Sequence, residues 1–351
     1  MDKRYFSEKL VEWYDQHKRD LPWRNTTDPY KIWLSEIILQ QTRVRQGLPY
    51  YLNFIKRFKT VTALANAAEE EVLRLWQGLG YYSRARNLHK CARIVVARHG
   101  GTFPSSFSEL ITLPGIGEYT AAAIASFSAR EKVAVVDGNV FRVLSRIYGE
   151  SVPINSPEGK KVFTARATAL ISDEFPDVFN QAIMEFGAMW CTPRQPACDK
   201  CMFAEKCVAA IQGIQSMLPI KLKKEKSRRR FFNYFVVRKG NSLLMKKRES
   251  RDIWNGLYDF YLVETSKSTA PEKLIEADSF LKKIVSGSIE ASSDYKHVLT
   301  HQTIISRFLL VDGKGFPDVR ESALKYIPVK KINDLPKPAL INRFLEDYNF
   351  L

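Results

Sequence analysis

The sequence lacks any long hydrophobic run. No stretch of the 351 residues approaches the roughly 18 consecutive apolar residues that a membrane-spanning helix needs. The first twenty residues are charged and amphipathic, without the apolar core of a signal peptide. We therefore expect a cytoplasmic protein with no membrane partner, in a compartment where thiols stay reduced.

Acidic residues are also in short supply. The chain has 38 Asp and Glu against 54 Lys and Arg, which gives a formal net charge of +16. An excess of this size favours a polyanionic partner, with nucleic acid first and an anionic membrane surface second. Hydrophobic residues make up 45% of the chain, which argues against disorder, and the length suits two or three domains.

The pattern of apolar and charged residues changes once along the chain. Residues 1–217 carry apolar residues at helical spacing, and Asp28 followed by Pro29 is a typical helix start. In residues 218–230, LPIKLKKEKSRRR, the last ten positions include seven Lys or Arg. This run predicts a solvated linker, and it could also lie along a phosphate backbone. Residues 231–351 predict an α+β domain with a hairpin turn at 239–241 and strands at 258–265 and 297–311.

Cysteine is rare but concentrated. Four of the five cysteines fall within seventeen residues with the spacing C-x6-C-x2-C-x5-C, at Cys191, Cys198, Cys201 and Cys207. Four thiolates at such spacing could hold zinc or an iron–sulfur cluster. Zinc sites usually consist of two C-x2-C pairs, and here only one pair has that spacing, which favours a [4Fe–4S] cluster. Zinc and disulfides remain alternatives, although disulfides are disfavoured in a reducing compartment.

A glycine-rich turn lies at residues 113–124, LPGIGEYTAAAI. Gly115 and Gly117 would let the backbone turn tightly and approach a ligand closely. The amides at the start of the following helix suit a phosphate oxygen. The motif predicts a helix–hairpin–helix that holds the DNA backbone without sequence specificity, and an ordinary interhelical turn would look similar.

Two carboxylates stand out by their surroundings. Glu36 has Ile32 and Trp33 as helical neighbours, and desolvation on an apolar face would raise its pKa to suit a general acid. Asp137 follows the apolar run 133–136 and precedes Gly138, so it could be a plain helix cap or an ionised carboxylate held by amides. Such a pair could cleave a glycosidic bond, although Glu36 could equally lie at the edge of the apolar stripe with its head in water.

Taken together, these motifs resemble the helix–hairpin–helix DNA glycosylase superfamily with an iron–sulfur cluster. The similarity is closest to the MutY adenine DNA glycosylases and covers essentially the whole chain, including LPWR at 21–24, WLSEIILQQTRV at 33–44 and GLGYYSRARNL at 78–88. Endonuclease III-type members have a lysine at the second residue after the second hairpin glycine. This chain has Tyr119 there, and a phenol is a poor substitute for a Schiff-base amine.

The resemblance implies a monofunctional DNA N-glycosylase of base excision repair, without strong AP lyase activity. It would hydrolyse the N-glycosidic bond of adenine mispaired with 8-oxoguanine or guanine in double-stranded DNA, as a nucleoid-associated monomer. Glu36 would protonate adenine at N7 and Asp137 would stabilise the cationic sugar. Tyr119 and Asn139 would assist them.

The resemblance also implies a set of residues that contact DNA. Trp23 and Arg24 would line the adenine pocket with Gln181, which stands where some relatives have Glu. Gln41 and Tyr81 would wedge into the gap that adenine leaves. The remaining assignments are Thr42 and Leu79 on the 8-oxoguanine side, and Gly115 and Gly117 on a phosphate.

By the same resemblance, residues 1–217 form an all-α glycosylase domain with its iron–sulfur module at 191–207, 218–230 form the linker, and 231–351 form a Nudix-like domain that senses 8-oxoguanine. The second domain lacks the Nudix hydrolase box, so we expect no phosphohydrolysis. The family's sensing motif Phe-Ser-His is replaced here by Leu299, Thr300 and His301. The alternatives are a glycosylase of the same fold that acts on oxidised pyrimidines, and a non-catalytic damage-binding protein.

Overall fold

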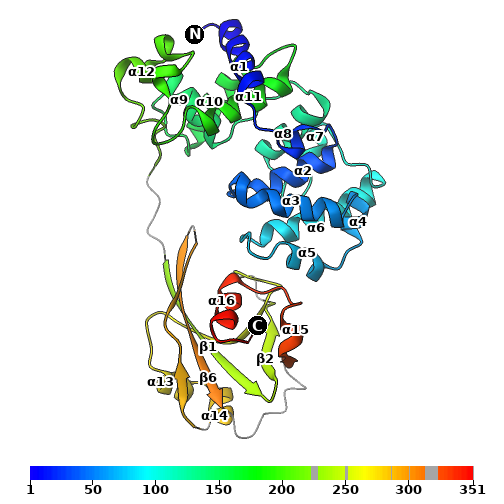
Figure 1. The fold of residues 1–351 in the computed structure, drawn as a ribbon, viewed down its shortest axis with the longest axis vertical. Helices are drawn as coiled ribbons and strands as arrows, with labels where there is room; N and C mark the ends of the chain where they lie inside the picture. Colours follow the sequence, from blue (N-terminus) through cyan, green and yellow to red (C-terminus); the bar gives the residue numbers. More distant parts are fainter. Residues whose placement is uncertain (223–227, 250–251, 286, 300, 313–322, 351) are drawn as a thin grey trace. The chain divides into compact units, whose positions relative to one another are not determined.

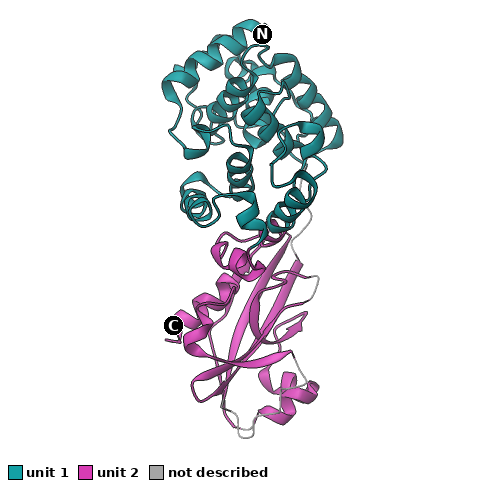
Figure 2. Ribbon diagram, turned by 90° about the vertical axis from the view of Figure 1, so that its right-hand side faces the viewer, with its two compact units in different colours: residues 1–66, 87–224 teal, residues 67–86, 225–351 magenta. Residues whose placement is uncertain are grey.

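The computed structural model describes residues 1–222, 228–249, 252–285, 287–299, 301–312 and 323–350. The chain divides into two compact units, one made of residues 1–66 and 87–224 and the other of residues 67–86 and 225–351 (Figure 2). The second unit therefore includes a segment from within the predicted glycosylase domain. In the part of the chain that is described, no helix is both long and apolar enough to cross a membrane.

The first unit is helical, as predicted. Its elements include α1 (Lys3–His17), α2 (Pro29–Leu39), α3 (Val44–Arg57), α4 (Val61–Ala65), α7 (Phe107–Leu110), α8 (Glu118–Ala129), α9 (Gly138–Tyr148), α10 (Pro157–Leu170), α11 (Pro176–Met189) and α12 (Val208–Gln212), with short 3-10 helices at Pro22–Arg24, Cys198–Lys200 and Ala204–Lys206. Helix α6 (Ser83–His99) enters this unit from the second one.

Helix caps fix where the two predicted carboxylates lie. Asp28 accepts a hydrogen bond from the Tyr30 amide and starts α2, the helix that carries Glu36. Asp137 caps α9 in the same way. Helix α8, whose buried residues are mostly alanines, packs against α2, and both α9 and α1 pack against α11 (Figure 1). The core between α1, α9 and α11 combines aliphatic side chains with aromatic ones such as Trp13 and Phe186.

The second unit is built around a mixed seven-stranded sheet. Its strands are β1 (Arg228–Lys239), β2 (Ser242–Lys247), β3 (Tyr258–Thr265), β4 (Ile289–Ala291), β5 (Tyr295–Val298), β6 (Gln302–Asp312) and β7 (Leu324–Pro328). Their order is β4-β6-β1-β3-β2-β7, with β5 paired to β6. Among the described strands, β1 and β6 pair in parallel and the other pairs are antiparallel.

Helices cover both faces of this sheet. Buried leucines and isoleucines of α13 (Pro271–Ala277) and α14 (Ser279–Ile284) pack against one face. On the other face, Phe344 of α16 (Ala339–Asp347) stacks on Phe308 with ring centroids 3.9 Å apart. The remaining helices are α5 (Glu69–Leu75) and α15 (Val329–Ile332).

Two expectations from the sequence need correction. The predicted linker, residues 218–230, does not extend to its last three residues, because Arg228–Arg230 pair with β6 and begin β1. The predicted strand at 297–311 is two antiparallel strands, β5 and β6, joined by a tight reversal in which the Leu299 amide donates to the Gln302 carbonyl. The polar residues 300–303, Thr-His-Gln-Thr, interrupt the apolar pattern there, but they include no glycine, proline, asparagine or aspartate that would mark a turn.

Candidate active site

Glu36 lies inside the first unit rather than at its surface. Its side chain is only 7% exposed, and the Tyr119 hydroxyl donates a 2.7 Å hydrogen bond to Glu36 Oε2. Burial raises the pKa of Glu36 to about 7, against the opposing effect of the Tyr119 hydrogen bond. The carboxyl is therefore partly protonated at neutral pH, as a general acid requires.

Asp137 is held by hydrogen-bond donors. Its carboxylate accepts from the backbone amides of Asn139 and Val140, both at 2.8 Å, and from Asn139 Nδ2 at 2.7 Å. Burial raises the pKa of Asp137 above its ordinary value, while these hydrogen bonds and the nearby Arg142 oppose that rise. The donors stabilise the anionic form, which is the form able to face a developing positive charge.

The fold brings these two carboxylates together across a hundred residues of sequence. Glu36 and Asp137 line one cavity of about 630 Å³. Other predicted residues line the same cavity, namely Trp23, Arg24, Thr42, Tyr119, Asn139 and Gln181. The spacing of the motifs alone could not establish this meeting.

The cavity wall contains a buried ion-pair cluster that was not predicted from the sequence. Glu185 is 1% exposed and accepts bidentate hydrogen bonds from the guanidinium groups of both Arg19 and Arg24. Burial alone would raise the pKa of Glu185, but the two arginines lower it to about 2. The one signal available was helical spacing, since Glu185 lies one turn after Gln181 on α11.

The two hairpin glycines differ in what the backbone requires. Gly115 has φ +80°, and an added Cβ would come within 2.9 Å of Asn87 Cβ. Gly117 has φ −96°, which any residue adopts, so the conformation of the turn requires glycine at 115 and not at 117. Nothing lies within 4 Å of a Cβ added at Gly117, which leaves the start of α8 open to a ligand.

The predicted wedge residues have a common backbone conformation. Gln41 (φ 56°) and Tyr81 (φ 49°) are both in the left-handed region that non-glycine residues rarely adopt. Both side chains are exposed. Leu79, by contrast, is buried, so a contact between its side chain and 8-oxoguanine stays a prediction.

The second unit has a cavity of its own, of about 320 Å³. It brings together three of the predicted residues, Tyr81, Leu299 and His301, with Trp254 and Gln302 among its other lining residues. Thr300, the middle residue of the expected sensing motif, lies outside the described residues.

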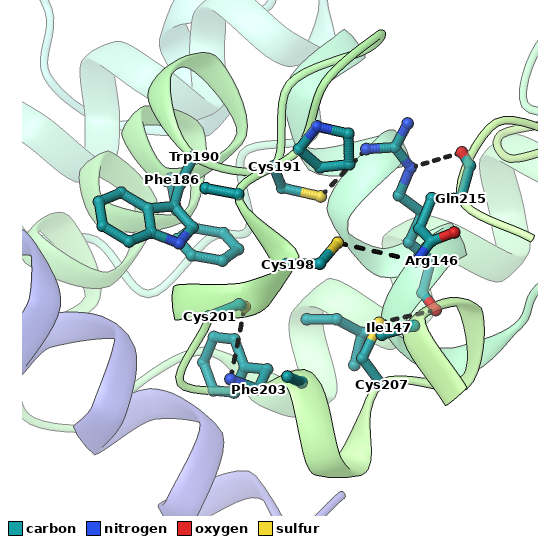
Figure 3. A pocket seen from close by; sticks show the side chains of 14 residues that line it. Arg146, Ile147, Phe186, Trp190, Cys191, Cys198, Cys201, Phe203, Cys207 and Gln215 are labelled. Carbon is teal, nitrogen blue, oxygen red and sulfur yellow. Dashed lines mark hydrogen bonds between the residues drawn. The ribbon is translucent and has the colours of Figure 1, made fainter. Parts of the chain in front are cut away.

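The four clustered cysteines surround one cavity, which Figure 3 shows from close by. All four are free thiols, and apolar side chains such as Phe186, Ile147 and Phe203 complete its wall. Arg146 Nη1 lies 3.4 Å from Cys191 Sγ and Gln215 Nε2 lies 3.8 Å from Cys198 Sγ, so both donate to sulfur. Four soft sulfur donors with N–H donors around them form a set that suits an iron–sulfur cluster.

Two further observations concern cysteine and metal ions. Cys91 is buried elsewhere in the unit, and burial raises its pKa to about 12. Across the described ranges, no group of three or more His, Cys, Asp or Glu side chains is arranged to hold a single metal ion.

Both units of the chain are similar to known protein families, and the first unit is similar to solved structures. Residues 34–161 match the HhH-GPD superfamily base excision DNA repair protein model, and residues 233–347 match the NUDIX domain model. Among solved structures, a thermostable thymine-DNA glycosylase is 30% identical with a TM-score of 0.56 and covers 60% of this chain and 97% of its own. An endonuclease III in a non-covalent DNA complex, 19% identical, covers 61% of this chain and 99% of its own at a TM-score of 0.53, which supports the helical fold of the first unit.

Curated relatives extend the match to the whole chain. The adenine DNA glycosylase of Homo sapiens is 43% identical over 222 residues, which cover 61% of this chain and 41% of that protein. The adenine DNA glycosylase of Buchnera aphidicola subsp. Schizaphis graminum is 32% identical over 345 residues, which cover 97% of this chain and 98% of that protein. With both of its folded units accounted for by such relatives, the chain belongs to the adenine DNA glycosylase family.

Proposed function

We propose that this protein is a monofunctional DNA glycosylase that removes adenine mispaired with 8-oxoguanine or guanine, by hydrolysis of the N-glycosidic bond. The observation that carries the proposal is the meeting of Glu36 and Asp137 in one cavity, where one carboxyl has a pKa near 7 and the other is held by three donors. Glycosidic cleavage needs one carboxyl group that donates a proton and one that is ionised, and the three donors favour the ionised form of Asp137.

In the reaction, Glu36 gives its proton to N7 of adenine, which becomes a better leaving group. The C1′–N9 bond then breaks, and adenine departs with the bonding electrons and the added proton. The carboxylate of Asp137 stabilises the oxocarbenium-like sugar that remains. Water adds to C1′ and loses a proton to the Glu36 carboxylate, which leaves an abasic site and restores the pair.

Neighbouring residues orient the two carboxyl groups. Tyr119 fixes Glu36 through its hydroxyl, and Asn139 holds Asp137 with both its side-chain and backbone N–H groups. None of the described residues that line this cavity is a lysine. An amine able to form a Schiff base with C1′ is therefore missing from the lining, in line with a glycosylase that leaves the strand intact.

Adenine has to leave the base stack to enter the cavity, at a cost of roughly a few kcal/mol. We infer that Gln41 and Tyr81, both exposed and strained, fill the space that adenine leaves. The open start of α8 at Gly117 would bind a backbone phosphate. The cavity of the second unit, with Leu299 and His301 in its wall, would contact the 8-oxoguanine side.

The clustered cysteines would hold a [4Fe–4S] cluster through Cys191, Cys198, Cys201 and Cys207. When bound, the cluster supplies four iron–thiolate bonds that cross-link residues 191–207, and the base-release steps above do not involve it. Chemical analysis of the purified protein for iron, sulfide and zinc tests this assignment. Zinc in place of iron and sulfide would contradict it.

The test of the function is a cleavage assay on duplexes with adenine opposite 8-oxoguanine, adenine opposite guanine, adenine opposite thymine, and an oxidised thymine. Each duplex is analysed with and without alkali. We expect strand cleavage at the mispaired adenines only after alkali, and its loss in Glu36→Gln and Asp137→Asn with DNA binding retained. Cleavage at oxidised thymine, or cleavage without alkali, would contradict the proposal.

A further inference from the structure

Gln181 is the one uncharged amide side chain on α11 that lines the adenine cavity, and its orientation is set from outside that cavity. The Tyr14 hydroxyl of α1 donates a 2.8 Å hydrogen bond to Gln181 Oε1. Tyr14 itself is 4% exposed and does not line the cavity. The contact therefore reaches the cavity wall from behind, across the packed interface of α1 and α11.

The direction of this hydrogen bond is fixed by its chemistry. An amide oxygen can only accept, so the Tyr14 hydroxyl must donate. Burial raises the pKa of Tyr14 to about 12, so the hydroxyl keeps its proton at any pH at which the protein works. With Oε1 occupied, Nε2 is the group of Gln181 left for a ligand, and it has no hydrogen-bond partner among the described residues.

The Tyr14 ring is also held in place. The Arg24 guanidinium lies over it, 5.6 Å from the ring centroid. Arg24 cannot move freely because Glu185 binds both of its terminal nitrogens, at 2.9 and 2.7 Å. The buried carboxylate of Glu185 therefore holds Arg24 in place. Arg24 in turn covers the ring of Tyr14, whose hydroxyl orients the amide of Gln181.

We propose that Tyr14 is a positioning residue for base specificity, because it presents Gln181 to the substrate as a hydrogen-bond donor only. This inference rests on the proposed function. Adenine has three ring acceptors. N7 is assigned to Glu36 and N3 lies beside the sugar, which leaves N1 for Gln181 Nε2. Hypoxanthine and guanine have N1–H at this position, so two donors would face each other and both would lose their partners.

The test compares adenine with hypoxanthine, each placed opposite 8-oxoguanine, in single-turnover base-release assays. In Tyr14→Phe the amide of Gln181 can turn over and accept from N1–H. We expect the ratio of the adenine rate to the hypoxanthine rate to fall about tenfold, the size of one hydrogen bond. Because Tyr14 acts through Gln181, Tyr14→Phe should lower this ratio no further in a Gln181→Ala background.

Tyr148→Phe is the matched control. It removes another buried tyrosine hydroxyl, one that has no hydrogen-bond partner among the described residues and lies outside the cavity lining. The proposal is overturned if Tyr14→Phe changes the ratio no more than Tyr148→Phe does, or if it lowers the ratio equally with and without Gln181. If the unmodified protein releases no adenine at all, the proposed function fails instead, so the two failures are distinguishable.

Discussion

At the scale of single residues, burial gives an ordinary glutamate an unusual proton affinity. Glu36 is almost fully covered, and its pKa rises from 4.5 to about 7. The protonated form is the proton donor, so we expect the rate constant of adenine release to fall as the pH rises through about 7. A pH–rate profile under single-turnover conditions measures this. A rate that is flat between pH 6 and 8.5 would argue against Glu36 as the acid.

The same shift predicts a pH-dependent stability. The folded protein binds a proton at Glu36 more tightly than the unfolded chain does, so the contribution of Glu36 to stability is greatest below about pH 4.5 and falls until about pH 7. A shift of this size corresponds to roughly 3 kcal/mol. Glu36→Gln removes the free-energy cost of burying an ionised carboxylate. The stability of the variant relative to the unmodified protein should therefore be greater at pH 8 than at pH 4.5. Urea unfolding at both pH values measures the difference, and an equal difference at both would contradict it.

Tyr119 modulates that proton affinity. Its hydrogen bond lowers the pKa of Glu36 against the effect of burial. We therefore expect Tyr119→Phe to shift the fall in the pH–rate profile to higher pH while slowing the reaction, because the acid is less well oriented. Tyr148→Phe again serves as the control with an unchanged profile. A shift to lower pH in Tyr119→Phe would contradict the assignment.

At the scale of elements, the two glycines of the hairpin before α8 have different roles. Gly115 is required by the backbone, whereas Gly117 leaves space for a ligand. Gly115→Ala introduces a Cβ at positive φ and against Asn87, and we expect a loss of about 1–3 kcal/mol of stability. Gly117→Ala should leave stability nearly unchanged and weaken binding to undamaged duplex DNA, because its Cβ would occupy the space of a phosphate. Urea unfolding and DNA titration distinguish the two. Equal destabilisation by both substitutions would contradict this division.

Helix caps and glycine-containing turns could be predicted from neighbouring residues in the sequence. Contacts between elements that are distant in the sequence could not. Asp28 and Asp137 are helix caps whose neighbours in the chain identify them, and the hairpin turn before β2 has its glycine and asparagine in sequence. The reversal between β5 and β6 carries no such residues and was missed. The Tyr14–Gln181 hydrogen bond spans 167 positions and could not be found by any spacing rule.

At the scale of the whole molecule, the net charge of +16 favours DNA binding that weakens as salt is added. We expect the logarithm of the affinity to fall linearly with the logarithm of the salt concentration, since phosphate contacts release counterions. The slope should be the same for a duplex with an A·8-oxoguanine mispair and for an undamaged duplex, because phosphates are common to both. Fluorescence anisotropy titrations at several salt concentrations measure it. An affinity for undamaged DNA that does not vary with salt would contradict this view.

The division of the chain into two units has a consequence for its synthesis. Residues 67–86 leave the ribosome early, yet they belong to a unit whose other residues begin at 225. The Tyr82 hydroxyl donates to the carbonyl of Lys337, so Tyr82 emerges long before its partner has been made. The same segment contains Trp76 and Leu73, which are both fully buried in the finished protein. At about 5–20 residues per second, the intervening chain takes roughly ten seconds or more to translate. During that interval the apolar side chains of this segment stay without the rest of their unit, so we expect them to be open to chaperones that act on nascent chains.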